Sequence, residues 1–68
     1  MAGHTGDRET VAAGLTDGLP EARRIAIGAA ARLGMLNAAT LLPHLEDPDL
    51  HVRHRAVEVA ARLLDGHL

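Results

Sequence analysis

At 68 residues the chain is long enough for one small domain. It contains no cysteine and no aromatic residue, its formal net charge is −2, and its seven basic residues are all arginines. A disulfide framework, a thiolate metal site and a strong attraction to nucleic acid or to an anionic membrane are therefore not expected. No apolar run approaches the roughly 20 residues of a membrane span, and the N-terminus lacks the layout of a signal peptide, so we expect a cytoplasmic protein.

The first half of the chain predicts two helices. Residues 1–6 are expected to be flexible, and Asp7 is suited to start a helix that runs to about Thr16. The stretch DGLP, residues 17–20, then predicts a turn and a second helix, because aspartate caps helices and proline is tolerated in their first turn. Gly34 is a stop signal at the end of this second helix.

The second half of the chain predicts another pair of helices. Asn37 is suited to cap the first of them, in which Pro43 should bend or loosen the helix near its end. Asp47 is expected to cap the last helix with Pro48 at its first position, and Gly66 to stop it. Apolar residues at helical spacing form one stripe of the shorter helix: Ala38, Leu41, Leu42 and Leu45.

The two halves are related by an offset of thirty residues. Residues 11–34 laid over 41–64 give eight identities in 24 positions. Fixed-period similarity of this kind is typical of repeat proteins, so we interpret residues 7–34 and 35–66 as two copies of one unit, with 67–68 as a tail. The charged identities include Asp17 with Asp47 and Arg23 with Arg53.

Each of these arginines lies inside the apolar arc of its predicted helix. A buried arginine carries an unpaired charge unless a carboxylate meets it, and each copy has an aspartate six residues before its arginine. The apolar arc is also wider than one neighbouring unit would cover. Five side chains are therefore expected to stay partly uncovered in a monomer: Leu41, Leu42, Leu50, Val57 and Leu64.

This combination resembles the HEAT repeat, in particular the short HEAT-like type named after phycobilisome lyases. The resemblance is close in LLPHLEDPDLHVRHRAVEVAARLLDG and looser in VAAGLTDGLPEARRIAIGAAARLG, where Ile25 and Gly28 depart from the second copy. It implies an all-α fold, an α-solenoid segment of two helix-turn-helix repeats with four helices. It also implies a ladder of hydrogen bonds between units, in which Arg53 meets Asp17 or Asp47. The ladder residues are then Asp17, Arg23, Asp47 and Arg53.

HEAT-like arrays are mostly scaffolds that bind proteins on the curved surface made by their second helices. The resemblance therefore implies a non-catalytic protein–protein interaction module that binds a protein partner or itself. No cofactor, nucleic acid, membrane or small-molecule substrate is expected. The alternative is a part of a larger HEAT-like protein that acts on nucleic acid or as a chromophore-lyase-like enzyme. The candidate partner-binding face comprises Glu21, Arg24, Ile25, Arg32, His51, His54, Arg55, Glu58 and Arg62.

The residue types present give little indication of a catalytic site or a metal site. The chain has no cysteine and no serine, and its threonines have no nearby pairing of histidine and carboxylate, so no enzyme is expected. His51 and His54, with His44 and Asp47 across the turn, would allow a three-ligand zinc site. The preferred interpretation is a run of solvent-facing polar residues without metal.

Overall fold

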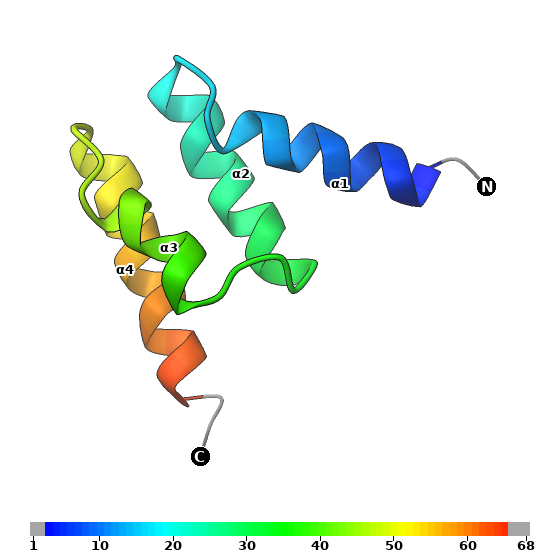
Figure 1. The fold of residues 1–68 in the computed structure, drawn as a ribbon. Helices are drawn as coiled ribbons and strands as arrows, with labels where there is room; N and C mark the ends of the chain where they lie inside the picture. Colours follow the sequence, from blue (N-terminus) through cyan, green and yellow to red (C-terminus); the bar gives the residue numbers. More distant parts are fainter. Residues whose placement is uncertain (1–2, 66–68) are drawn as a thin grey trace.

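The computed structural model describes residues 3–65, which form four helices. These are α1 (Gly3–Gly14), α2 (Pro20–Arg32), α3 (Ala38–Leu45) and α4 (Leu50–Asp65), and the described residues contain no strand (Figure 1). The prediction of an all-α chain with four helices is confirmed.

The first helix starts earlier than predicted. α1 begins at Gly3 and not at Asp7, so residues 3–6 of the segment expected to be flexible are helical. A cap contributes only about 1 kcal/mol, and no proline precedes Asp7 to stop the helix. α1 ends at Gly14, two residues before the predicted end, where a Cβ atom would lie 2.9 Å from the Cβ of Ala26. The missing side chain therefore allows α1 and α2 to cross closely.

The start and end of α2 follow from the turn residues on either side. The Asp17 carboxylate accepts a hydrogen bond from the Leu19 N–H at 2.8 Å, which shapes the turn, and Pro20 occupies the first turn of the helix. At the other end, Gly34 has a φ of 70° and the Met35 N–H donates to the Ala30 carbonyl at 2.9 Å. This is the geometry of a Schellman motif, so the predicted stop at Gly34 is confirmed.

The short helix α3 is capped as the sequence indicates. The Thr40 N–H donates to the Asn37 side-chain oxygen at 2.9 Å, and the Asn37 N–H donates to the Thr40 hydroxyl at 2.8 Å. These reciprocal bonds form a capping box. Pro43 lies inside the last turn, and the helix ends two residues later, at Leu45.

The start of α4 was predicted two residues too early. The cap is Asp49, whose Oδ1 accepts hydrogen bonds from the N–H groups of His51 and Val52 at 2.9 and 3.1 Å. Asp47 is not the cap, because its carboxylate is bound by Arg23 and by the Asp49 N–H instead. The predicted stop at Gly66 and the tail 67–68 lie outside the described residues.

The helices form a thin molecule around a small core. α2 and α4 lie side by side, α1 packs on α2, and α3 packs on α4 (Figure 1). The principal axes measure 33, 32 and 16 Å, so the molecule is about half as thick as it is wide. Every helix therefore keeps a solvent-facing side. The buried cluster consists of Ile27, Ala30, Leu36, Leu41, Val52, Ala56 and Val59.

The apolar residues left outside this cluster were largely predicted. Leu42, Leu50, Val57 and Leu64 are exposed, as expected for an uncovered arc. Leu41 was wrongly included in that set, because it is buried in the core cluster with residues of α2 and α4.

Candidate functional site

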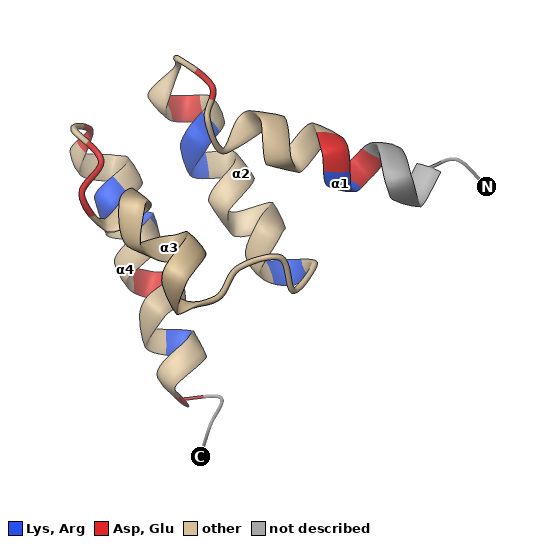
Figure 2. Ribbon diagram, viewed as in Figure 1, with Lys and Arg blue, Asp and Glu red and all other residues tan. Residues whose placement is uncertain are grey.

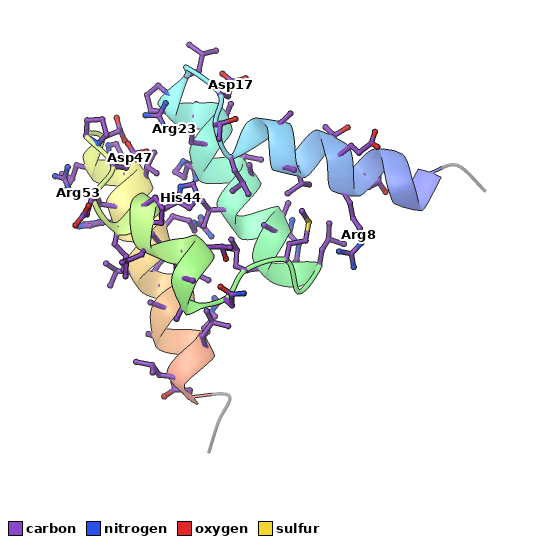
Figure 3. The ribbon with its side chains drawn as sticks, viewed as in Figure 1. Arg8, Asp17, Arg23, His44, Asp47 and Arg53 are labelled. Carbon is purple, nitrogen blue, oxygen red and sulfur yellow. The ribbon has the colours of Figure 1, made fainter. Side chains whose placement is uncertain are left out.

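Asp47 is the point at which the two helix pairs are joined by charged groups. Its carboxylate accepts hydrogen bonds from Nε and Nη2 of Arg23 at 2.7 and 3.0 Å, a bidentate arrangement. The same carboxylate accepts from the Asp49 N–H at 2.9 Å, and the Asp47 carbonyl accepts from Nη1 of Arg53 at 2.7 Å. In Figure 3, Asp47 lies between Arg23 and Arg53. The side chain of Asp47 is only 7% exposed, so water competes little with these bonds.

The partners within the ladder differ from those expected. Arg53 meets Asp47 through the backbone carbonyl and not through the carboxylate, and Asp17 offers Arg23 only its carbonyl, at 2.8 Å. The carboxylate partner of Arg23 comes from the following turn, 24 residues later. Each arginine thus binds the carbonyl of its own turn, which holds the guanidinium where the next turn can supply a carboxylate.

The ion pair between Arg23 and Asp47 shifts the titration of both groups. The hydrogen bonds from Arg23 lower the pKa of the Asp47 carboxyl, burial opposes this change, and the Asp49 N–H adds to it. Pairing with the same carboxylate raises the pKa of Arg23, which stays protonated. The pair is therefore ionised over the whole neutral range.

The residues of the predicted partner-binding face on α2 and α4 line three separate hollows. A cleft of about 310 Å³ lies between these helices, with the apolar residues Ala31, Val59 and Leu63 in its wall. Its charged residues are Arg32, Arg55, Glu58 and Arg62. A second hollow, of about 280 Å³ between α1 and α2, also contains Arg32. Glu21, Arg24 and His51 line a separate hollow of about 220 Å³ at the turn end of α2 and α4.

The charges on this face are mostly arginine. Arg55 lies 3.6 Å from Glu58, and Arg24 lies 3.0 Å from Glu21. Among the side chains of residues 7–65, no carboxylate is within ion-pair distance of Arg32 or Arg62. Figure 2 shows acidic residues at the two turns, with arginines of α2 and α4 beside them, and further acidic residues on α1 and α4. The cleft between α2 and α4 therefore carries excess positive charge.

Two other residues of the predicted face lie outside the cleft. Ile25 is 58% exposed, and His54 is also exposed. Gly28 lies beneath Arg55, because a Cβ atom added there would be 3.7 Å from Nη1 of Arg55.

The sequence interpretation missed a groove between α3 and α4. This groove has a volume of about 480 Å³. The sequence feature that could have predicted the groove is a pair of adjacent leucines in each of α3 and α4, because adjacent residues of a helix cannot both face one core. The lining residues are Leu36, Asn37, Ala38, Leu41, Leu42, Leu45, Ala60, Leu63 and Leu64.

The histidines considered for zinc do not gather into a site in the part of the chain that the structure describes. His51 and His54 are exposed on α4, and His44 is half-buried on α3. Within residues 3–65 no three histidine, aspartate or glutamate side chains are close enough together to hold a metal ion. Over the same residues, no helix combines the length and the apolar character needed to cross a membrane.

Comparison of the chain with protein-family models, with curated proteins and with solved structures finds no match.

Proposed function

We propose that this chain is a non-catalytic protein-binding module, a segment of α-solenoid built from two HEAT-like units, whose α2/α4 cleft receives an acidic segment of a partner protein. The observation that carries this proposal is the cleft itself. It combines an apolar wall with three arginines and a single glutamate. A peptide with acidic and aliphatic side chains would complement both features.

The repeated hydrogen bonds at the two turns support the two-unit interpretation. Asp17 and Asp47 each accept from the N–H two residues later, at 2.8 and 2.9 Å. Arg23 and Arg53 each donate Nη1 to the carbonyl six residues earlier, at 2.8 and 2.7 Å. The same local structure thus recurs after thirty residues, as expected of units that stack by one rule.

A protein ligand fits this surface better than a nucleic acid. The net charge of the chain is −2, which gives no long-range attraction to phosphate. There is also no aromatic side chain on which a base could stack. The arginines are confined to a cleft with an apolar wall, which suits a peptide segment more than a phosphate backbone.

A fluorescence-anisotropy titration with labelled peptides tests this proposal. The probes are peptides in which glutamates flank leucines, and matched peptides in which glutamine replaces every glutamate. We expect the acidic peptides to bind more tightly. Arg55→Glu and Arg62→Glu should each weaken that binding by about tenfold or more. Ala12→Glu, at an exposed position on α1 away from the cleft, is the control for added negative charge and should bind as the wild type does.

Three outcomes would reject the proposal. Equal affinity for acidic and neutral peptides would show that the cleft does not select charge. Undiminished binding by both cleft variants would show that the ligand lies elsewhere. Saturable binding of a DNA duplex at physiological salt, in the absence of peptide binding, would favour the nucleic-acid alternative.

A further inference from the structure

At each end of the molecule, one charged group of the ladder lacks, among the described residues, the ion-pair partner that Arg23 and Asp47 have in each other. Arg23 uses Nη1 for a carbonyl and its other two nitrogens for the Asp47 carboxylate. Arg53 uses Nη1 in the same way, but no carboxylate among the side chains of residues 7–65 pairs with its guanidinium. Asp17 is exposed, and its carboxylate accepts only the Leu19 N–H within the described residues. In the part of the chain that the structure describes, one end of the molecule therefore carries an arginine without a carboxylate partner, Arg53, and the other end carries an aspartate without an arginine partner, Asp17.

The apolar residues around Arg53 point to the same missing neighbour. Val57 corresponds to Ile27 at the thirty-residue offset. Ile27 is fully buried between the two helix pairs, whereas Val57 is 55% exposed. Leu50 and Leu64 share the face of α4 that carries Arg53 and Val57, because their spacing is three, four and seven residues. We call these four residues the α4 stripe: Leu50, Arg53, Val57 and Leu64.

The opposite end presents smaller side chains, and α1 already covers one of them, because Ala26 is buried against Gly14. Ile27 packs in the core with Val52, Ala56 and Val59 of α4. The positions thirty residues before these three are all alanines, so the corresponding face of α2 is shallower: Ala22, Ala26 and Ala29. Ala29 also lines the hollow of about 280 Å³ between α1 and α2.

We propose that the chain associates head to tail with a second copy of itself, with the α4 stripe of one copy packed against α1 and α2 of the next. Arg53 then pairs with Asp17 of the neighbouring copy as Arg23 pairs with Asp47 within one chain. The inference rests on the repeat geometry of the proposed function, but it uses a surface distinct from the α2/α4 cleft. Because the two contacting surfaces differ, the contact repeats and builds a linear array.

Sedimentation equilibrium of the 68-residue chain over a dilution series reaching millimolar concentration tests the association. We expect the average mass to rise steadily with concentration and to pass the dimer. Val57→Glu places a charge in the contact and should weaken association at least about tenfold. Circular dichroism should show an intact fold, because Val57 is exposed in the monomer. Ala39→Glu, at an exposed position on α3 outside both contacting surfaces, is the control and should assemble as the wild type does.

The proposed ion pair between Arg53 and Asp17 of the neighbouring copy is tested by exchanging the two charges. Asp17→Arg and Arg53→Glu should each weaken self-association, because each places like charges across the contact. An equimolar mixture of the two variants should recover assembly, since every contact is then between opposite charges. Asp17→Asn keeps the acceptor for the Leu19 N–H while removing the charge, so it separates the ion pair from the turn.

The outcomes distinguish this inference from the proposed function. A wild-type monomer at every concentration, a mass that stops at the dimer, or unchanged assembly of Val57→Glu would each overturn head-to-tail association. The acidic-peptide titration is repeated on Val57→Glu, in which the cleft is intact. Peptide binding by that variant together with a monomeric wild type would reject the array alone. Assembly without peptide binding supports the array and rejects the cleft alone.

Discussion

Asp47 stabilises the contact between the two helix pairs with both its side chain and its backbone. Its carboxylate holds Arg23 of α2, and its carbonyl holds Arg53 of α4. Its neighbour Asp49 has the same carboxylate but caps α4. Two residues of one chemical type, two positions apart, therefore have different structural roles, and the position of Arg23 decides between them.

The lowered pKa of Asp47 predicts a particular loss of stability in acid. An unfolded aspartate titrates near about pH 4, and the folded carboxyl titrates below that value. Between the two pKa values the unfolded chain binds more protons, so the free energy of unfolding falls as pH falls. Asp47→Asn should be less stable than the wild type at neutral pH and should show a flatter decline in acid.

Urea unfolding at a series of pH values from about 2 to about 6 checks this prediction. Glu46→Gln, at an exposed neighbouring position, is the control and should leave the urea midpoint at neutral pH unchanged. If Asp47→Asn and the wild type lost stability in parallel as the pH fell, the ion pair with Arg23 would not contribute to stability in solution.

At the scale of helices and turns, the ends are set by short polar segments. Asn37 with Thr40 starts α3, and Gly34 ends α2 with a backbone conformation that other residues adopt at a cost. Gly34→Ala should therefore lower the free energy of unfolding by about 1–2 kcal/mol. Gly18→Ala is the matched control, because a Cβ atom there would meet nothing within 4 Å and the φ of Gly18 is not positive. Thermal unfolding of both variants by circular dichroism measures the difference, and equal midpoints would contradict the prediction.

The sequence predicted what is decided within a few neighbouring residues. The cap at Asn37 and the stop at Gly34 each depend on side chains or backbone within one turn, and both were predicted correctly. The cap of α4 was misplaced because Asp47 and Asp49 are equally suited to it locally. The choice between them depends on Arg23, which is 24 residues away from Asp47.

The candidate site could be predicted only in part, for the same reason. Spacing placed Arg55, Glu58 and Arg62 on the solvent side of α4, and these residues do line the cleft. Which arginine would meet which carboxylate was not readable from spacing, because it depends on how α2 and α4 pack. The groove between α3 and α4 was missed because it arises from the angle between two helices, which periodicity does not define.

At the scale of the whole molecule, the core is one layer of side chains between α2, α3 and α4. In so thin a molecule a buried residue has no second shell to absorb a cavity. Ile27→Ala should therefore cost about 2–5 kcal/mol, a large part of the stability of a domain of this size. Val57→Ala, thirty residues later in the sequence, should cost little in dilute solution because Val57 is already exposed.

Urea titrations of both variants at low and high protein concentration check this pair. Ile27→Ala should be destabilised equally at both concentrations. If the chain associates as proposed, Val57→Ala should be less stable than the wild type only at high concentration, where association would stabilise the wild type. A large loss from Val57→Ala at low concentration would mean that Val57 is covered within the monomer.

The attachment of α1 through one neighbour has a consequence for motion. Among the described helices, α1 packs on α2 alone, whereas α4 packs on both α2 and α3. Val11 of α1 packs against the core cluster, but the contacts of α4 with α2 and α3 do not involve α1, so detachment of α1 need not require global unfolding. Native-state hydrogen exchange should find the amides of α1 exchanging through a local event and those of α4 only when the whole chain opens. In an array of copies, α1 of the first copy would remain able to detach. At every internal position, α1 would be held by the α4 stripe of the preceding copy.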